Sequence, residues 1–361
     1  MNQKIVYIAR FIPHYHVPLW KELSKKFREN DDTFYLLSVK EPPKEGRTGV
    51  DGKIIDNHYF YEKDIEQYIG SFCLYWQMGV LSILEEIKPD KIIMPGHVGN
   101  ATSWRICQKY DKVLTWQCGY EYHSAKIKDF LQKKYLNSFI HHLAYHTYAK
   151  NFTMRYGIPE KNITVMHNTI DQGQLKLAPI EESREFLKNN YDISLDAKVL
   201  LYVGTILKEK KLDVLVDMID YLDDTFTLII VGDGPYKKEL EKKESKNLVF
   251  TGNQLEDKHH FFISADIFFM PGTGGLALNE AMFYGNILFS ALGDGSAEDL
   301  VIEDFNGKRI DNLDAKALAK AVNEIYENDK IKVFKENAIQ LKDKFSFKEF
   351  TNTIVNTVSN I

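Results

Sequence analysis

The sequence predicts an α/β protein made of two doubly wound halves, and three observations lead to that prediction. Short apolar runs alternate with segments of helical periodicity along the whole chain, a pattern typical of βαβ units and parallel sheets. The length of 361 residues suits two domains of ordinary size. A polar, charged stretch at 171–197 separates the two series and is expected to contain the linker. We therefore expect one domain at 1–172 and a second at 173–344.

The first half is expected to form a parallel sheet with helices packed on it. Its strands are short apolar runs, at Lys4–Ala9, Thr33–Val39, Lys91–Met94, Lys112–Trp116, His142–Ala149 and Ile163–Met166. Its helices are segments in which apolar residues recur at helical spacing, at Pro18–Phe27, Ser71–Ile87, Ala101–Tyr110 and Lys126–Ile140.

The second half repeats this alternation. The expected strands are Val199–Val203, Thr227–Val231, Leu248–Phe250, Ile267–Met270 and Ile287–Ser290. The expected helices are Leu212–Leu222, Lys237–Lys243, Lys258–Ser264 and Leu276–Tyr284. In open α/β sheets ligands bind outside the carboxyl ends of the strands, so the loops that follow these strands are the first places to look for chemistry.

Composition narrows the function classes. A hydrophobic fraction of 44% and a charged fraction of 27% are ordinary for a globular protein, and they exclude wholesale disorder. The net charge of -5 argues against nucleic acid as a partner, because such binding needs a large basic surface. The three cysteines are far apart, without a Cys-x-x-Cys pair, which favours a reducing cytoplasm. No apolar run approaches the roughly 18 residues of a membrane span, and we read no signal peptide at the N-terminus.

Three loops of the second half have the composition of a phosphate site. Val203–Lys211 holds a turn glycine followed by lysines, and Val231–Pro235 holds two glycines and a helix-starting proline. In Met270–Met282 a glycine-rich loop runs into a helix that carries Glu280. Free N–H groups and the helix dipole make such a helix start an anion site. The alternatives are an ordinary βα loop with solvated lysines and a solvent-exposed helical glutamate.

In this order, the three segments resemble the C-terminal half of glycosyltransferase family four. Further matches lie in the same half, at Asn247–Gly252, Ala265–Pro271, Glu280–Gly285, Asp299–Val301 and Asn306–Gly307. In the first half the matching stretches are Pro13–Trp20, Pro159–Ile163 and Asn168–Asp171. The resemblance implies the GT-B fold, in which two Rossmann-like domains face a cleft. It also implies that the final helix, 345–361, packs back on the N-terminal domain.

The resemblance also assigns roles to residues. Lys210 and Glu280 are expected to contact the donor phosphate and the ribose, and with Glu121 and His123 they form the expected catalytic set. The expected donor-binding set is Gly204, Thr205, Lys210, Gly232, Asn253, Gln254, Leu255, Thr273, Gly274, Gly275, Leu276 and Glu280. The expected acceptor side consists of His14, Tyr15, Gly119 and Tyr120.

Three positions depart from the family pattern. Thr205 stands where an arginine is usual, and Asn286-Ile287 replaces Leu-Pro. Gly272 stands where the family has a glutamate that contacts the donor sugar. The branch of the family with a Pro-His-Tyr first loop often lacks that glutamate too.

Two further segments bear on partners. The helix that begins at Lys126 alternates lysines with apolar residues, so it is predicted either to lie on an anionic membrane surface or to pack on the core with a solvated lysine face. His142 and His146 are four residues apart, but no carboxylate completes a metal set, so we expect no metal.

The resemblance implies a retaining glycosyltransferase that moves a hexose-type sugar from a UDP- or GDP-sugar to a glycan or lipid-linked glycan. The setting implied is bacterial surface polysaccharide synthesis, in the cytoplasm or on the inner face of the membrane. The nucleotide sugar is a substrate, and no separate cofactor is expected. Two alternatives stay open, a nucleotide-sugar-binding protein with little activity and a sugar epimerase on the same fold.

Overall fold

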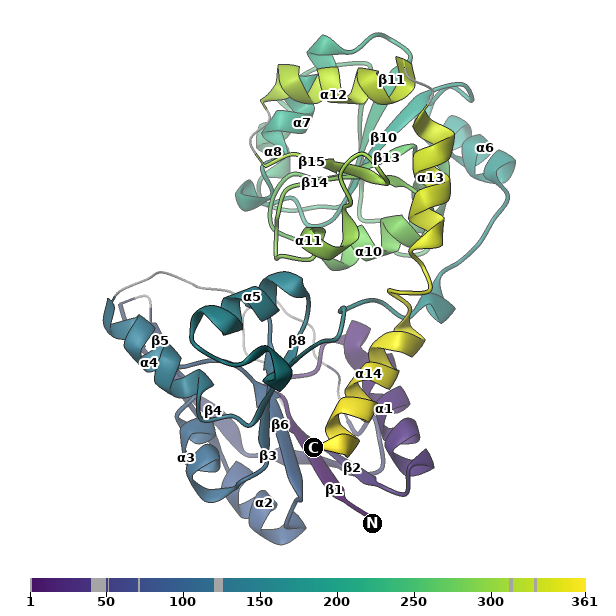
Figure 1. Cartoon of the computed structure of the whole chain (residues 1–361). Helices are drawn as coiled ribbons and strands as arrows, with labels where there is room; N and C mark the ends of the chain where they lie inside the picture. The colour runs from purple at the N-terminus through teal and green to yellow at the C-terminus, as the bar shows by residue number, and fades with distance from the viewer. Residues whose placement is uncertain are drawn as a thin grey trace. The chain divides into compact units, whose positions relative to one another are not determined.

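The chain divides into two compact units, unit 1 at Met1–His167 with Lys348–Ile361 and unit 2 at Asn168–Phe347 (Figure 1). The structure is a computed structural model that describes residues 2–39, 50, 52–70, 72–119, 126–311, 314–327 and 330–361. The division between the units lies a few residues from the boundaries expected at 172/173 and 344/345. An α/β fold with two Rossmann-like units is confirmed.

Unit 1 is built on a seven-stranded parallel sheet in the order β3-β2-β1-β6-β7-β8-β9. The strands are β1 (Lys4–Ile8), β2 (Thr33–Val39), β3 (His58–Tyr61), β6 (Lys91–Pro95), β7 (Val113–Gln117), β8 (His141–Ala144) and β9 (Ile163–Val165). A separate antiparallel hairpin, β4 (Lys63–Ile69) with β5 (Phe72–Met78), follows β3. The central strands are apolar on both faces, as expected of a parallel sheet that helices cover on both sides.

The helices of unit 1 lie on both faces of that sheet (Figure 1). They are α1 (Val17–Glu29), α2 (Val80–Ile87), α3 (Ala101–Lys109), α4 (Lys126–Leu136), α5 (Thr147–Arg155) and the C-terminal α14 (Phe347–Asn360), with short 3-10 turns at His14–His16 and Glu160–Asn162. The helix α14 packs within unit 1. Its Val358 carbonyl accepts a 2.6 Å hydrogen bond from Lys91 Nζ, and its Phe350 ring meets that of Trp116.

Two expectations for the first half were wrong. The helix expected at Ser71–Ile87 is strand β5 followed by α2, because Gly79, in a left-handed conformation, ends the first element and starts the second. Aromatic residues in 72–78 favour a strand, and the apolar spacing concealed it. The strand expected at His142–Ala149 ends at Ala144, and the His146 side chain then caps α5 by accepting from Ala149 N at 3.1 Å.

Unit 2 carries a six-stranded parallel sheet in the order β12-β11-β10-β13-β14-β15. Its strands are β10 (Lys198–Val203), β11 (Phe226–Val231), β12 (Leu248–Gly252), β13 (Ile267–Met270), β14 (Ile287–Ser290) and β15 (Gly307–Arg309). Numbered within the unit, this is the strand order 3-2-1-4-5-6 of the Rossmann fold, and the order reverses between β10 and β13. The loops after β10 and β13 meet at that reversal, which is the position where open α/β sheets bind ligands.

The helices of unit 2 surround a continuous apolar core. They are α6 (Ile180–Tyr191), α7 (Asp213–Met218), α8 (Lys237–Leu240), α9 (Lys258–Ser264), α10 (Leu276–Phe283), α11 (Ala297–Leu300), α12 (Ala315–Glu327) and α13 (Lys330–Gln340), with 3-10 turns at Gln172–Gln174, Lys208–Lys210 and Ile219–Tyr221. The stretch at 171–197, expected to hold the linker, contains α6. The many polar residues of α6 gave it the composition of a linker, although Leu187 on its buried side belongs to the core.

Candidate functional site

The loops after β10 and β13 pack directly on each other at the point where the strand order of unit 2 reverses. Gly272 is buried there, and a Cβ added to it would lie 2.3 Å from Glu209 O and 2.6 Å from Lys210 Cα. Lys210 ends a 3-10 turn, and its ammonium group donates to the Thr273 carbonyl oxygen. The absence of a side chain at position 272 is therefore what lets the Lys210 backbone lie against the glycine-rich loop.

The loops after β10 and β11 are also joined through glycine. An added Cβ at Gly232 would lie 2.0 Å from Gly204 O, and one at Gly234 would lie 2.3 Å from Ile206 O. Ile206 N donates to Asp233 O at 2.9 Å. The predicted donor residues Gly204 and Gly232 are thus brought together, and their role in the fold is close backbone packing.

The glycine-rich loop leads into α10 without a capping side chain. Gly275 is the N-cap residue, and no side chain accepts from the first turn of the helix among the described residues. Gly274 lies beside the Lys210 ammonium group, because a Cβ added to Gly274 would lie 3.6 Å from Lys210 Nζ. An uncapped helix start next to a lysine is an electropositive position that suits a phosphate group.

Glu280 lies on α10, and its two carboxylate oxygens have different surroundings. The residue is 7% exposed, its Oε2 accepts from Lys258 Nζ at 2.9 Å, and its buried Oε1 has no hydrogen-bond partner among the described residues. A buried carboxylate oxygen without a donor is costly, so a ligand hydroxyl at that position would be stabilised. The role in ribose binding that the family resemblance implies for Glu280 stays a prediction.

Burial alters the ionisation of two groups at this site. It lowers the pKa of the Lys210 ammonium group, which Glu209 partly offsets. It raises the pKa of Asp294, whose carboxylate oxygen Oδ2 lies against Gly275, 2.0 Å from an added Cβ. Asp294 also accepts from Ser296 N at 2.9 Å. Lys210 and Asp294 thus lie next to the same glycine-rich loop, and both are partly shielded from water.

The remaining donor residues of unit 2 lie further out. Asn253 and Leu255 are exposed, the latter by 88%, and Gln254 Nε2 donates to Tyr191 OH at 2.9 Å. Thr205 is exposed, and its carbonyl oxygen accepts from Tyr202 OH at 3.1 Å. Leu276 is the first residue of α10.

Part of the expected acceptor side of unit 1 follows its strands. His14 and Tyr15 lie in the turn after β1 and are exposed, Tyr15 by 64%. Gly119 follows β7 in a left-handed conformation, with Ala149 Cα 2.6 Å from an added Cβ. Tyr120, Glu121 and His123 lie outside the described residues.

Three residues at the site of unit 2 were missed by sequence reasoning. Asp294 lies in a Gly-Asp-Gly loop after β14, a pattern like that of the other loops, which could have drawn attention to it. Lys258 is paired with Glu280 across 22 positions of sequence, and nothing local signals that contact. Asn279, next to Glu280 on α10, is 1% exposed, and both of its side-chain amide atoms are without a partner among the described residues.

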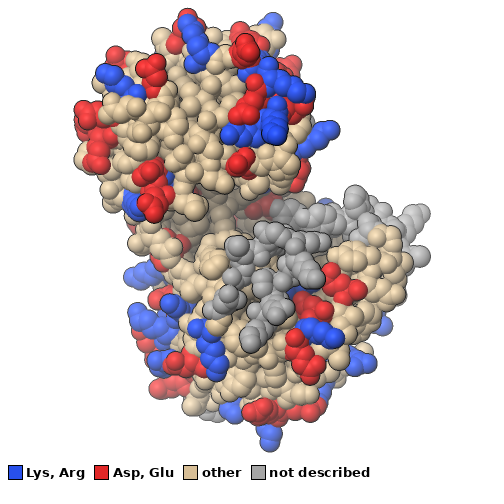
Figure 2. Space-filling model, turned by 180° about the vertical axis from the view of Figure 1, so that it is seen from behind, with Lys and Arg blue, Asp and Glu red and all other residues tan. Residues whose placement is uncertain are grey.

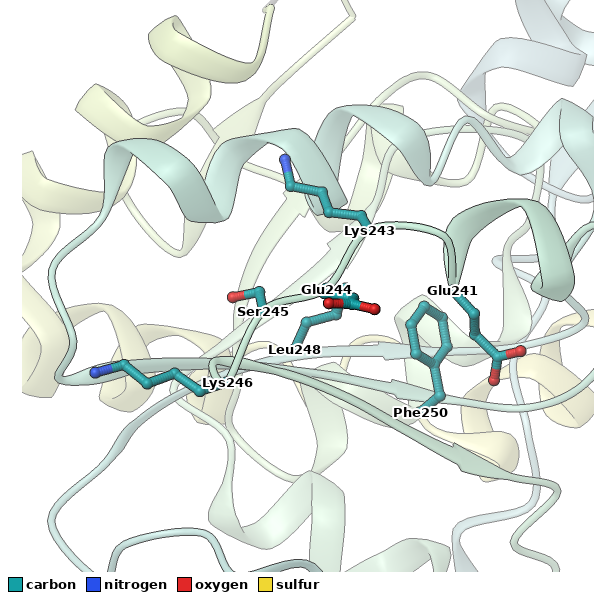
Figure 3. A pocket seen from close by; sticks show the side chains of 7 residues that line it. All are labelled: Glu241, Lys243, Glu244, Ser245, Lys246, Leu248 and Phe250. Atoms are coloured by element: carbon teal, nitrogen blue, oxygen red, sulfur yellow. The ribbon is translucent and has the colours of Figure 1, made fainter.

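Hollows formed by the described residues of unit 2 include two that contain none of the predicted site residues. One, of about 530 Å³, is lined by Glu241, Lys243, Glu244, Ser245, Lys246, Leu248 and Phe250 beside edge strand β12 (Figure 3). Lys243 there is paired with Asp217 and Asp220, and Lys246 with Asp224. The other, of about 560 Å³, contains Arg184 and Asp266 at the start of strands β10 and β13. Both hollows are distinct from the loops described above.

The described part of the chain contains neither a cluster of metal ligands nor a membrane-spanning helix. No group of three or more His, Cys, Asp or Glu side chains there could hold a metal ion. None of its helices is long and apolar enough to cross a membrane. On the face drawn in Figure 2, positive and negative side chains are interspersed on both units.

Comparison with known proteins finds a family match within unit 2. Residues 183–341 match the family model of the glycosyl transferases group 1. Over 115 residues the chain is 36% identical to sulfoquinovosyl transferase SQD2 of Arabidopsis thaliana, covering 30% of this chain and 22% of that one. Over 95 residues it is 32% identical to a putative teichuronic acid biosynthesis glycosyltransferase, TuaC, of Bacillus subtilis, covering 25% and 23%. The chain thus matches less than a quarter of the length of these curated relatives.

Solved structures extend the likeness to both units. The crystal structure of Anabaena HepE in complex with UDP and glucose is similar with a TM-score of 0.72 and 16% identity, covering 100% of both chains. Sucrose-phosphate synthase of Thermosynechococcus elongatus is similar with a TM-score of 0.73 and 14% identity, covering 99% of both. The predicted fold class, that of the GT-B glycosyltransferases, is confirmed.

Proposed function

We propose that the chain is a retaining glycosyltransferase that moves a hexose-type sugar from a UDP- or GDP-sugar to a glycan or lipid-linked glycan acceptor. The observation that carries the proposal is the convergence of Lys210, the glycine-rich loop and the uncapped start of α10 at one point of unit 2. The family match of 183–341 and the UDP and glucose bound to HepE support a nucleotide sugar as the donor.

The reaction needs stabilisation of a departing diphosphate. The bond between the anomeric carbon and the diphosphate oxygen breaks, and a new bond to the acceptor oxygen forms. The acceptor hydroxyl proton passes to the departing phosphate, so no separate base is required. Lys210 and the N–H groups at the start of α10 supply preorganised positive potential where negative charge develops. Glu280 Oε1 is buried without a donor among the described residues, so a ribose hydroxyl that reaches it would satisfy it.

The biological setting proposed is bacterial surface polysaccharide synthesis in the cytoplasm, at the inner face of the membrane. The relative named for teichuronic acid biosynthesis supports this setting. Helix α4 supports contact with a membrane, because Lys133 and Lys134 are exposed beside Phe130, which is 70% exposed.

The test is ligand-induced stabilisation of the purified chain by UDP, GDP and their common sugar conjugates. A ligand that binds only the folded state raises the melting temperature. We expect one nucleotide to raise it, and we expect both Lys210→Ala and Glu280→Ala to abolish the increase. Lys208→Ala is the matched control, since Lys208 is an exposed lysine of the same loop. Donor turnover only when an acceptor is present would distinguish transfer from epimerisation, and binding without turnover would indicate the low-activity alternative.

We expect Lys210→Ala to lower kcat/KM about 100-fold, the usual loss for one preorganised group that stabilises transition-state charge. The assay measures release of the nucleoside diphosphate at a fixed acceptor concentration. Wild-type rates in Lys210→Ala would remove this residue from the mechanism.

A further inference from the structure

The loop after β14 also packs on the glycine-rich loop of unit 2. A Cβ added to Gly293 would lie 3.0 Å from Gly274 O, and one added to Gly275 would lie 2.0 Å from Asp294 Oδ2. Lys210, from the loop after β10, reaches the same glycine-rich loop through its ammonium group. The start of α10 is therefore bordered by a lysine from one loop and by an acid from another.

Asp294 is a half-buried acid, and no lysine or arginine among the described residues forms an ion pair with it. Its carboxylate is held by neutral donors, because Ser296 N donates to Oδ1 at 2.9 Å and the Ser296 side chain also binds it. Glu280, the other acid near this loop, is instead paired with Lys258. A carboxylate offers about four acceptor positions, so the contacts with Ser296 leave Asp294 able to accept from a further donor.

A second polar group lies on the same side of α10. Asn279 follows Gly275 by one helical turn, and its backbone N donates to Gly275 O at 3.3 Å. Residues four apart share a face of a helix, and helical side chains lean towards its N-terminus, so Asn279 leans towards the Gly275 end. The residue is 1% exposed, and neither of its side-chain amide atoms has a partner among the described residues. This side of α10 thus carries unsatisfied polar groups where an apolar core would need none.

The charges around the start of α10 match the composition of a nucleotide sugar. Such a molecule has a negative diphosphate that joins two hydroxyl-bearing rings, the ribose and the transferred sugar. Lys210 and the uncapped helix start suit the diphosphate, which a carboxylate would repel. Carboxylates accept readily from hydroxyl groups, and the site has two of them on different elements, Glu280 on α10 and Asp294 in the loop after β14. Since Glu280 is the predicted partner of the ribose, Asp294 is left for the transferred sugar.

We propose that Asp294 is a specificity-determining residue that accepts a hydrogen bond from a hydroxyl group of the transferred sugar. The inference rests on the proposed function, because it assigns a contact to one part of the donor that Lys210 is proposed to bind. Burial supports it, since an acid that is partly shielded from water and lacks a cationic partner gains more from a donated hydrogen bond than a solvated acid does. The affinity that the sugar adds to the nucleotide then depends on Asp294, whereas the affinity for the nucleotide alone does not.

The test compares nucleoside diphosphates with nucleotide sugars by isothermal titration of the full chain. The probes are UDP, GDP, UDP-glucose, UDP-galactose, UDP-N-acetylglucosamine and GDP-mannose. The variant is Asp294→Asn, which keeps the side-chain shape and an oxygen for Ser296 N but puts an amide group, which cannot accept, in place of Oδ2. For the nucleotide sugar that wild type binds, we expect Asp294→Asn to raise Kd about tenfold, the usual effect of losing one hydrogen bond to a charged group. Kd for the corresponding nucleoside diphosphate is expected to stay the same.

Glu298→Gln is the matched control, because Glu298 is an exposed acid four positions further along the chain and is expected to leave every Kd unchanged. Retained binding of the nucleoside diphosphate verifies that Asp294→Asn folds. An equal loss of affinity for the nucleoside diphosphate and the nucleotide sugar would make Asp294 a structural residue of the loop and overturn the proposal. A nucleotide-sugar Kd that Asp294→Asn leaves unchanged would overturn it alone, whereas a wild-type chain that binds none of the probes would overturn the proposed function as well.

Discussion

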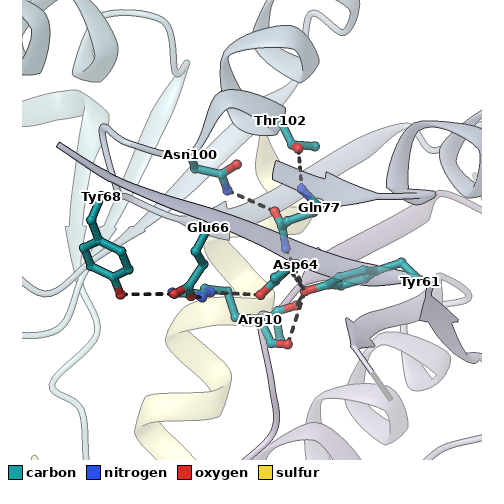
Figure 4. Close-up of polar contacts among 9 residues, drawn as sticks. Arg10, Tyr61, Asp64, Glu66, Tyr68, Gln77, Asn100 and Thr102 are labelled. Carbon is teal, nitrogen blue, oxygen red and sulfur yellow. Dashed lines mark hydrogen bonds and ion pairs between the residues drawn. The ribbon is translucent and has the colours of Figure 1, made fainter. Parts of the chain in front are cut away.

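The two units share one strand order but differ at the edge where their strands end. Both sheets follow the order 3-2-1-4-5-6 when numbered within the unit, with β9 added in unit 1. In unit 2 the loops at that edge interlock through glycines such as Gly232 and Gly272, and Lys210 lies on them. In unit 1 the corresponding loops carry Arg10 and Asn100, which belong to a polar network that holds the β4–β5 hairpin (Figure 4). The comparison teaches that topology places the site, while loop composition decides what can bind there.

The largest effect is expected when a side chain is placed at Gly272 of unit 2, where the two loops pack together. We expect Gly272→Ala to lower donor turnover by at least about 100-fold, because the added methyl group overlaps the backbone of 209–210 and displaces Lys210. Turnover and nucleotide affinity measure the effect. All four tryptophans, at 20, 76, 104 and 116, lie in unit 1, so tryptophan-detected melting should be unchanged. Normal turnover would show that the loop tolerates displacement.

A smaller change breaks the polar network of unit 1. We expect Asp64→Asn to destabilise unit 1 by about 2 kcal/mol, because it removes the charge partner of Arg10 in a mostly buried network while keeping the side-chain shape. Tryptophan-detected thermal melting should shift downward, whereas nucleotide affinity should not change. An unaltered melting curve would mean that Glu66, the second acid paired with Arg10, holds it alone.

Sensitivity to acid is expected to distinguish the two units further, because buried neutral histidines lie in unit 1. Burial lowers the pKa of His142 to about 3, with help from His141, and that of His58 to about 4, with help from Lys53. The unfolded chain binds these protons near pH 6.5, so stability is intact above that pH and is lost as the pH falls towards 4.

Each such histidine is expected to cost about 1.4 kcal/mol per pH unit within that window. Tryptophan-detected melting from pH 7 to pH 4.5 measures the slope, and His58→Asn or His142→Asn should flatten it. A slope that both variants leave intact would assign the acid sensitivity to other groups, such as His16, whose pKa burial lowers to about 4.

The smallest expected effect concerns the neighbour of Glu280. Lys258→Met removes the ion pair between Glu280 Oε2 and the partly exposed Lys258. The Glu280 carboxylate is then left free for a ribose hydroxyl. We expect nucleotide affinity to change by less than about fivefold, because Lys258 is partly exposed and pairs with Oε2, not with Oε1, which has no partner among the described residues. Isothermal titration measures it, and a loss comparable to that of Lys210→Ala would make Lys258 part of the binding site.

Sequence reasoning worked best where a local pattern is tied to the backbone. The strand that precedes Gly204 and the loop that precedes Glu280 were predicted because glycine and apolar runs report local conformation directly. It failed for β5, where aromatic residues at mixed spacing resembled a helix, and for α6, whose charged face resembled a linker.

The contacts that complete the site could not be predicted in the same way. Lys258 meets Glu280 across 22 positions of sequence, and Asp294 lies against Gly275 only after β13 and β14 are paired. The anchoring of the β4–β5 hairpin likewise depends on Arg10, 54 positions before Asp64. Such long-range pairings leave no periodic signal in the chain.

The most direct test of a nucleotide site in unit 2 is hydrogen exchange of the whole chain with and without UDP or GDP. We predict that one of the two slows exchange in the loops at 204–211 and 272–280 and that Lys210→Ala abolishes this protection. Protection confined to unit 1, or none with either nucleotide at millimolar concentration, would contradict the assignment of the donor site.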